Sequence, residues 1–233
     1  MKKIFLSFLL ILASCTLSFA NDETLSVSGT GRVTVKPDSA VVRLGVETRK
    51  ETASLAQNDN AKIMAKIIET ISSLDIKKEN VQTLSFNIWP EINYGSGKAP
   101  VVTGYRASNQ LNILVADDLS KISKVIDRGI EAGANQVLGI TFAKNDDSSA
   151  KKEALSLAVK DAEYKAETIA NSAKVKIIGI QKIIEGEGPA TYQNVDGVRF
   201  LGTSGKGSGA PTPVEEGSID IVKNISIVYL IKK

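Results

Sequence analysis

The sequence has no histidine, and Cys15 is the single cysteine among its 233 residues. Zinc or copper sites made of cysteine and histidine ligands are therefore excluded, as are Ser-His-Asp and Cys-His catalytic arrangements. A disulfide within the chain is excluded too, because it needs two cysteines. The side chains left for catalysis are carboxylates, lysines and tyrosines.

The chain also lacks an excess of either charge and a long apolar segment. It carries 29 Lys and Arg residues against 26 Asp and Glu residues. Such a balance provides no compositional argument for binding nucleic acid or an anionic membrane, so we expect neither partner. The longest N-terminal apolar run, Ile4 to Ala13, is too short to span a bilayer, and we expect no transmembrane segment in the mature chain.

Residues 1–20 have the pattern of a signal peptide. Lys2 and Lys3 precede the apolar run, and Ser18-Phe19-Ala20 supplies the small residues of a cleavage site. Cleavage after Ala20 would leave residues 21–233 as the mature periplasmic protein. Leu12-Ala13-Ser14-Cys15 also has the pattern of a lipobox, in which Cys15 would become a lipid-anchored first residue. Both interpretations predict an exported protein.

Hydrophobic periodicity predicts an α+β protein. Alternating apolar residues predict strands, and a repeat of 3.6 residues predicts helices. The expected order is ββαββαβαββ, which favours a mostly antiparallel sheet with packed helices. The expected strands are 25–35, 40–46, 81–89, 101–115, 137–142, 177–184 and 219–231, and the expected helices are 52–74, 118–132 and a long helix that follows residues 145–148.

Turn and cap residues refine this layout. Lys36-Pro37-Asp38 predicts a tight turn that joins the first two strands as a hairpin, and residues 90–100 predict a more open hairpin loop between the third and fourth. Asp117 or Asp118 is expected to cap the second helix. Gly133 is expected to end that helix in a left-handed conformation.

The third expected helix carries alanine at every fourth position. A four-residue spacing drifts slowly around a helix of 3.6 residues per turn, so these small side chains form one ridge. The ridge should face the sheet or a neighbouring subunit, because another backbone can approach it closely. Its members are Ala154, Ala158, Ala162, Ala166 and Ala170.

Residues 185–218 predict a long, flexible glycine-rich loop inserted before the last strand. They hold eight of the eighteen glycines and three of the six prolines. A loop of this length inside a compact domain is uncommon and is usually either disordered or functional.

The short motifs that resemble active-site signals have simpler structural interpretations. Gly29-Thr30-Gly31 precedes strand residues, whereas a phosphate loop must open a helix, and Gly205-Lys206-Gly207 lacks the spacing of a P-loop. The acid pairs Asp117-Asp118 and Asp146-Asp147 stand where helices are expected to begin, which favours capping over catalysis. Glu215-Glu216 is the third acid pair. Such acids could also bind calcium through oxygen ligands, although Asn145-Asp146-Asp147-Ser148 lacks the alternating spacing and the closing glutamate of an EF-hand. We assign no catalytic, cofactor-binding or metal-binding residue.

Aromatic residues gather around the 90–106 hairpin. Trp89, Tyr94 and Tyr105, with Lys98 and Arg106 nearby, could form a stacking surface for a ligand or a glycan. Sheet packing and subunit contacts are the favoured interpretation, because aromatic residues are enriched at interfaces.

Several segments in order resemble the SIMPL-domain family of bacterial periplasmic proteins, which includes an oxidative stress defence protein and an immunogenic periplasmic antigen. The resemblance runs from about Thr24 to Tyr229. It implies a non-enzymatic exported protein that is associated with tolerance of oxidative stress. It also implies assembly from dimers into ring-like or channel-like oligomers. It implies no catalytic residues. The matching segments are Val27-Ser28-Gly29-Thr30-Gly31, Val35-Lys36-Pro37-Asp38, Val81-Gln82-Thr83, Gly104-Tyr105-Arg106-Ala107-Ser108-Asn109, Gly133-Ala134-Asn135, Gly139-Ile140-Thr141-Phe142, and Ala158 through Ala170 with Asp161 and Lys165.

The leading expectation is therefore a homo-oligomeric periplasmic protein without enzymatic activity, which needs no cofactor. An alternative is an envelope ligand-binding module that uses the 90–106 hairpin and the 185–218 loop. A third hypothesis, an enzyme that works without histidine, has no constellation of residues behind it.

Overall fold

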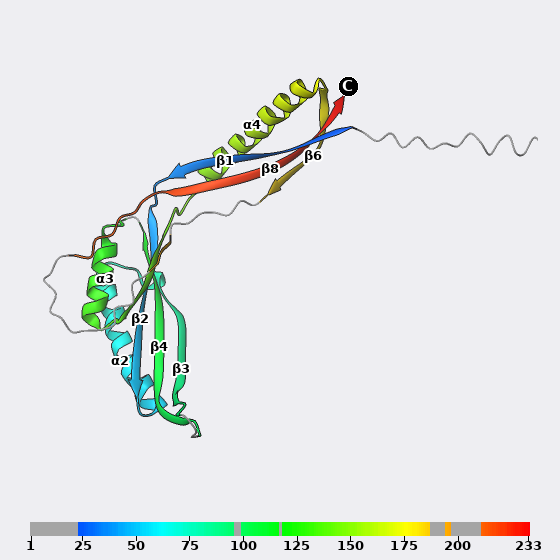
Figure 1. The fold of residues 1–233 in the computed structure, drawn as a ribbon. Helices are drawn as coiled ribbons and strands as arrows, with labels where there is room; N and C mark the ends of the chain where they lie inside the picture. The colour runs from blue at the N-terminus through cyan, green and yellow to red at the C-terminus, as the bar shows by residue number, and fades with distance from the viewer. Residues whose placement is uncertain (1–22, 96–98, 117, 187–193, 197–210) are drawn as a thin grey trace, which may run out of the picture. The chain divides into compact units, whose positions relative to one another are not determined.

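A computed structural model describes residues 23–95, 99–116, 118–186, 194–196 and 211–233. The expected signal peptide lies outside the described residues, and so does most of the expected glycine-rich loop. Figure 1 shows an α+β fold whose elements follow the predicted order, with one further short strand. The elements are β1 (Thr24–Val35), β2 (Ser39–Lys50), α2 (Ala53–Ser72), the short 3₁₀ helix η1 (Lys78–Asn80), β3 (Val81–Asn93), β4 (Val101–Ala116), α3 (Lys121–Ala132), β5 (Gln136–Ala143), α4 (Ser148–Ala173), β6 (Lys176–Gly186), β7 (Asn194–Asp196) and β8 (Ile219–Lys232).

The described strands form two sheets. One has the order β1-β8-β6, and the other has the order β3-β4-β2-β5-β7. The β2–β4, β2–β5, β3–β4, β5–β7 and β6–β8 pairings are antiparallel. The predicted α+β class and its antiparallel character are thus confirmed.

The expected hairpin of the first two strands is wrong, because β1 and β2 belong to different sheets. The Pro-Asp turn makes other contacts instead. Asp38 accepts a hydrogen bond from Lys144 Nζ at 2.6 Å and another from the backbone N–H of Asn145 at 2.8 Å. These bonds tie the turn to the segment that follows β5.

The chain divides into two compact units. Among the described residues, those within 32–154 and 188–223 form the larger unit, and residues 23–31, 155–186 and 224–233 form the smaller one. β1, α4 and β8 each begin in one unit and end in the other.

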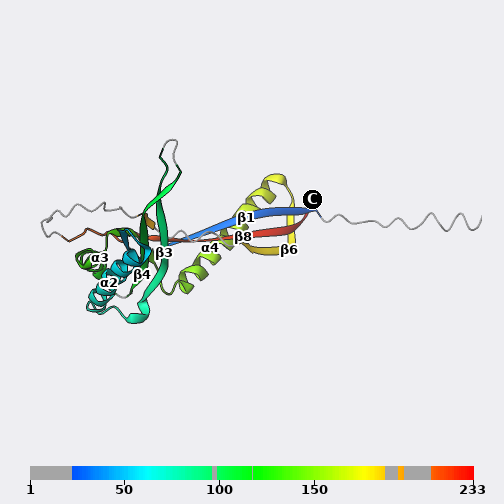
Figure 2. The same ribbon diagram turned by 90° about the horizontal axis from the view of Figure 1, so that it is seen from below.

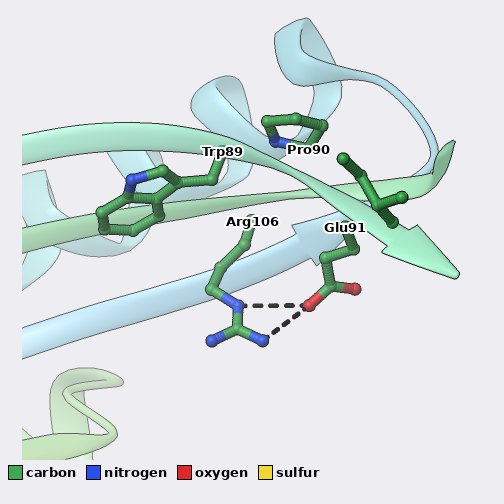
Figure 3. Close-up of a pocket in the computed structure, with 5 residues that line it drawn as sticks. Trp89, Pro90, Glu91 and Arg106 are labelled. Carbon is green, nitrogen blue, oxygen red and sulfur yellow. Dashed lines mark hydrogen bonds and ion pairs between the residues drawn. The ribbon is translucent and has the colours of Figure 1, made fainter. Parts of the chain in front are cut away.

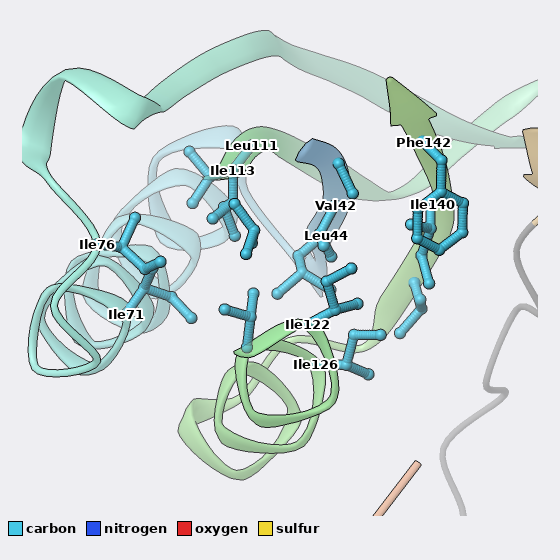
Figure 4. Packing of buried hydrophobic residues seen from close by; sticks show 14 of the residues in the cluster. Val42, Leu44, Ile71, Ile76, Leu111, Ile113, Ile122, Ile126, Ile140 and Phe142 are labelled. Atoms are coloured by element: carbon cyan, nitrogen blue, oxygen red, sulfur yellow. The ribbon is translucent and has the colours of Figure 1, made fainter. Parts of the chain in front are cut away.

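In the larger unit, α2 and α3 pack on one face of the five-stranded sheet. Alternate residues of β2 and β4 point toward these helices, as the two-residue period of a strand requires. Figure 4 shows Ile71 and Ile122 of the helices directed toward Leu44 and Leu111 of the strands. The fully buried side chains of this core include Val42, Leu44, Val46, Ile67, Ile71, Leu111, Ile113, Val115, Ile122, Val125 and Phe142.

The observed helix ends match the ends predicted from the sequence in part. Gly133 ends α3 with φ 120°, as predicted. The helix itself begins at Lys121, later than expected, because Asp118 accepts hydrogen bonds from the N–H and the hydroxyl of Ser120 and holds a turn before the first helical residue. Thr52 caps α2 by accepting a hydrogen bond from Leu55 N.

β3 continues past Pro90 to Asn93, beyond the predicted end at Trp89. Proline lacks the N–H that a central strand needs, which is why the sequence predicted a loop there. Among the described strands, β3 is outermost in its sheet and pairs with β4 alone, so the missing donor is tolerated.

In the smaller unit, α4 lies along the three-stranded sheet (Figures 1 and 2). The alanine ridge faces that sheet, since Ala158, Ala162 and Ala166 are fully buried against Val27 and the apolar residues of β8. A Cβ atom added to Gly29 would lie 2.6 Å from the backbone nitrogen of Ala162. The prediction of a close backbone approach to the ridge is confirmed.

Among the helices of the described residues, none combines the length and the apolar character needed to cross a membrane.

Candidate functional site

The face of the five-stranded sheet opposite α2 and α3 is lined with polar side chains. We call it the open face. Because side chains alternate along a strand, the residues between the core positions of β2, β3 and β4 point to this side. In register across the three strands they are Gln82, Asn112 and Arg43, then Ser85, Gln110 and Gly45, then Asn87, Ser108 and Glu47, and finally Trp89, Arg106 and Arg49.

Four charged side chains at one end of the open face form a linked cluster. Arg106 donates two hydrogen bonds to Glu91 Oε1, from Nε at 3.1 Å and from Nη2 at 2.8 Å. Arg49 Nη2 lies 3.1 Å from Glu47 Oε1, and Arg49 Nε lies 3.4 Å from Glu91 Oε1. Two cations and two carboxylates therefore balance one another across β2, β3 and β4.

This cluster changes the acidity of its members. The hydrogen bond from Arg106 lowers the pKa of Glu91, and the positive charge of Arg49 lowers it further. The bond to Glu91 raises the pKa of Arg106. Both groups are charged at neutral pH, so Glu91 is an acceptor and Arg106 a donor, and neither is poised to exchange a proton.

A hollow of about 360 Å³ opens beside the cluster (Figure 3). It is lined by Trp89, Pro90, Glu91, Ile92 and Arg106. The indole of Trp89 and the guanidinium of Arg106 extend from the same side of the sheet, as their paired register positions require. The Trp89 side chain is about half exposed, with a relative accessibility of 47%.

A second, smaller hollow of about 180 Å³ lies farther along the open face. Val41, Gln82, Asn112 and Leu114 line it together with Glu79 and Asn80 of η1. Three side-chain atoms of the open face are buried without a hydrogen-bond partner among the described residues: Arg43 Nε, Asn112 Oδ1 and Gln136 Oε1.

The Gly-Ala-Asn motif positions one border of this face. Asn135 lies just before β5, and its side chain acts as a substitute for strand backbone. Its Oδ1 accepts from Glu47 N at 2.8 Å, and its Nδ2 donates to Glu47 O at 2.7 Å. These bonds hold the strand segment that carries Glu47.

The acid pairs lie outside the open face. Asp146 accepts a hydrogen bond from Ser148 N at the start of α4, and hydrogen bonds from the Ser148 side chain first and from this N–H second lower the Asp146 pKa. Asp147 pairs with Lys151 at 2.8 Å, and Glu215 and Glu216 are exposed. Asp117 lies outside the described residues. Capping at Asp146 is thus confirmed, and the described residues contain no cluster of three acids that could hold a metal ion.

The Gly29-Thr30-Gly31 segment lies within β1, as the sequence predicted. The N–H of Thr30 donates to Asp161 Oδ2 at 2.8 Å, so this amide already has an anionic partner from α4. Gly205-Lys206-Gly207 lies outside the described residues.

The aromatic residues of the hairpin are not brought together. Trp89 lines the larger hollow, whereas Tyr94 projects from the end of β3 and is 74% exposed. Tyr105 pairs with Pro90 in register and so points to the other side of the sheet from Trp89. Lys98 lies outside the described residues. Among those stacking residues that the structure describes, Trp89 and Arg106 share one hollow.

Comparison with known proteins decides the family. The model of the SIMPL family, described as a protein of unknown function (DUF541), matches residues 25–229. This chain belongs to the SIMPL family.

Its similarity to known SIMPL relatives extends over most of the chain. The 26 kDa periplasmic immunogenic protein of Brucella melitensis biotype 1 is 27% identical over 212 residues, which is 89% of this chain and 84% of the relative. The protein of the same name from Brucella abortus strain S19 is 26% identical over the same shares. The uncharacterized protein YggE of Escherichia coli K12 is 22% identical over 87% of this chain and 80% of its own length.

Sequence reasoning missed the amide-rich character of the open face in this SIMPL protein. The signal is present in β3 and β4, where the polar positions of the alternation are occupied by Asn87, Gln110 and Asn112 rather than by lysine or glutamate. The solvated face of an antiparallel sheet carries polar side chains, and on these strands several of them are amides. The choice of amides is the feature that marks this surface.

Proposed function

We propose that this SIMPL protein is an exported, non-enzymatic periplasmic protein that forms a symmetric oligomer by pairing its β6 strand with a second copy. Export is supported by the leader pattern of residues 1–20 and by the Brucella relatives, which are named periplasmic. A structural role is supported by the carboxylates, which accept capping hydrogen bonds or ion pairs.

The observation that carries the oligomer is the character of β6. It is an outer strand of the three-stranded sheet and pairs there with β8. An outer strand leaves backbone N–H and C=O groups along one side for another strand, and soluble proteins usually protect such a side with charges or proline. β6 carries Lys176, Lys182 and Glu185, but it also exposes four isoleucines, Ile178 at 62%, Ile180 at 52%, Ile183 at 56% and Ile184 at 44%.

A second copy of β6 could both pair with the backbone groups on the outer side of the strand and cover its exposed isoleucines. Antiparallel pairing of one strand with its own copy is self-complementary and closes with two-fold symmetry. It would supply backbone hydrogen bonds along the free side and cover isoleucines from both copies. Such dimers could then build the ring-like assemblies that the family resemblance implies.

The oxidative-stress association rests on that resemblance. Cleavage after Ala20 removes Cys15, so the mature chain has no thiol to oxidise and its part in oxidative stress is indirect. Purified mature protein should not consume hydrogen peroxide stoichiometrically, and stoichiometric consumption would contradict an indirect role.

Light scattering coupled to size-exclusion chromatography tests the assembly. The protein should be expressed with its leader, purified from the periplasm and measured at micromolar concentration, where we expect a mass that is a multiple of the mature chain. Ile184→Lys places a charge on β6 and should reduce that mass. Ile169→Lys is the matched control, because Ile169 is also 44% exposed but lies on α4.

A monomeric wild-type protein would refute the proposal, and so would equal masses for the two variants and the wild type. The same preparation tests the N-terminus by intact mass. We expect Asn21 as the first residue, and a lipid-modified Cys15 would show instead that the chain is a lipoprotein.

A further inference from the structure

We propose that the open face of the five-stranded sheet binds a linear, uncharged oligosaccharide, with Trp89 as the stacking platform for one sugar ring. This site is separate from the β6 strand and does not depend on the proposed oligomer. Its argument rests on the hollow beside Trp89, on the paired charges around it and on the amides that continue along the face.

Trp89 provides an apolar surface of suitable shape. An indole ring is flat and is favourable for contact with the C–H groups of a pyranose ring, as it is for other flat apolar surfaces. Trp89 is about half exposed and borders a hollow of about 360 Å³, a volume typical of sites for small organic ligands. An exposed tryptophan in a hollow is costly to leave in water, so a ligand that covers it gains free energy.

The polar groups of the hollow are fixed in position and still have hydrogen-bonding capacity. Both hydrogen bonds from Arg106 to Glu91 end on Oε1, and the nearby Arg49 Nε also approaches Oε1. Within the described residues, none of these contacts uses Glu91 Oε2. A carboxylate oxygen can accept from a sugar hydroxyl, and a guanidinium can donate to the neighbouring one.

The amides extend this pattern along the sheet. Asn87 and Gln110 lie on the open face between the two hollows, and Asn112 lines the smaller one. Each amide has donors and an acceptor, and each sugar hydroxyl both donates and accepts. Arg106 and Asn112 are six residues apart on β4, or about 20 Å at the rise of an antiparallel strand. The two hollows therefore match a chain of several sugar rings.

The charges and amides of the open face favour an uncharged sugar over two other ligands, an anion and an apolar protein surface. Glu47 and Glu91 balance Arg49 and Arg106, so a phosphate or a nucleic acid would meet carboxylates as closely as cations. An apolar protein surface would bury amides without partners, which is unfavourable. An uncharged polymer rich in hydroxyl groups avoids both penalties.

Tryptophan fluorescence tests the proposal directly, because Trp89 is the single tryptophan of the chain. The purified mature protein should be titrated with chitohexaose, cellohexaose and maltohexaose. We expect at least one of these hexasaccharides to produce a saturable change in emission. If none of the three changes the emission up to millimolar concentration, the proposal is overturned.

Variants locate the binding site by calorimetry. Trp89→Ala should weaken the affinity about tenfold or more, and Trp89→Phe should retain part of it. Asn87→Ala should weaken it without disturbing the charged cluster. Tyr94→Ala is the matched control, since Tyr94 is an exposed aromatic residue of the same hairpin that does not line the hollow.

Melting temperature and oligomer mass should accompany each variant, so that a loss of binding is compared between folded proteins. Undiminished binding in both Trp89→Ala and Asn87→Ala would overturn the proposal, as would an equal loss in Tyr94→Ala. Ile184→Lys should bind the hexasaccharide as the wild type does. A failed oligomer test and a failed sugar test are therefore distinguishable.

Discussion

Gly29→Ala tests the contact between the alanine ridge and β1. The substitution adds one methyl group, and the added Cβ would lie 2.6 Å from Ala162 N, 2.8 Å from Ala162 Cβ and closer still to Ala158 O. Comfortable carbon contacts begin near 3.5 Å, so the contact with Ala158 O requires the strand and the helix to separate by more than about 1 Å. Two of the three atoms belong to helix backbone and cannot rotate away.

The expected cost is about 2–3 kcal/mol, in the upper part of the range for overpacked interiors. In a chain of this size each kcal/mol lowers the melting temperature by about 2–4 °C, which predicts a decrease of about 4–12 °C. The sign of the change in melting temperature tests the packing argument. Gly29 is not among the described glycines with positive φ, and at an unstrained position Gly→Ala normally stabilises a protein by about 0.4–1 kcal/mol through the unfolded chain.

Thermal unfolding followed by circular dichroism measures the effect. Ser28→Ala is the control, because Ser28 is the exposed neighbour of Gly29 and accepts from Lys165 through its backbone oxygen, which the substitution keeps. Ala162→Leu approaches the same contact from the helix and should cost about 1–3 kcal/mol. A Gly29→Ala protein that melts at or above the wild-type temperature would refute the packing argument.

Three further predictions concern single side chains. Asn135→Ala removes both bonds to the Glu47 backbone and should lower the free energy of unfolding by about 1–3 kcal/mol, measured by urea titration. The pKa of Asp161 is lowered, first by the hydrogen bond from Lys165 and then by that from Thr30 N. The ionised Asp161 therefore stabilises the folded protein above the unfolded pKa of about 3.9, and this stabilisation is lost as the pH falls through the folded pKa. Asp161→Asn should therefore melt below the wild type at pH 7, and this difference should begin to close near the unfolded pKa of about 3.9 and disappear below the lowered folded pKa. A difference independent of pH would contradict this. Tyr229 has a buried hydroxyl without a partner among the described residues, so Tyr229→Phe should leave the melting temperature unchanged or raise it, and a clear decrease would reveal a hidden partner.

Local signals predicted the elements well because they depend on neighbours in the sequence. The alternation in β8 and the four-residue alanine spacing in α4 correspond to the observed strand and helix, and Gly133 takes the left-handed conformation expected of a helix stop. The errors share one cause. The expected β1–β2 hairpin and the early end of β3 at Pro90 both depend on which strands are neighbours, and no local pattern contains that information.

The sequence by itself determined that the chain has no histidine and cannot form an internal disulfide, and it determined the order of helices and strands and the small-residue ridge of α4. These follow from composition and periodicity, which are properties of the chain alone. Only the tertiary structure decided that the ridge meets Gly29, that Asn135 completes the ladder beside Glu47, and that Trp89 and Arg106 share a hollow with Glu91. Those contacts join residues far apart in the sequence, and their positions depend on the pairing and register of the strands that carry them.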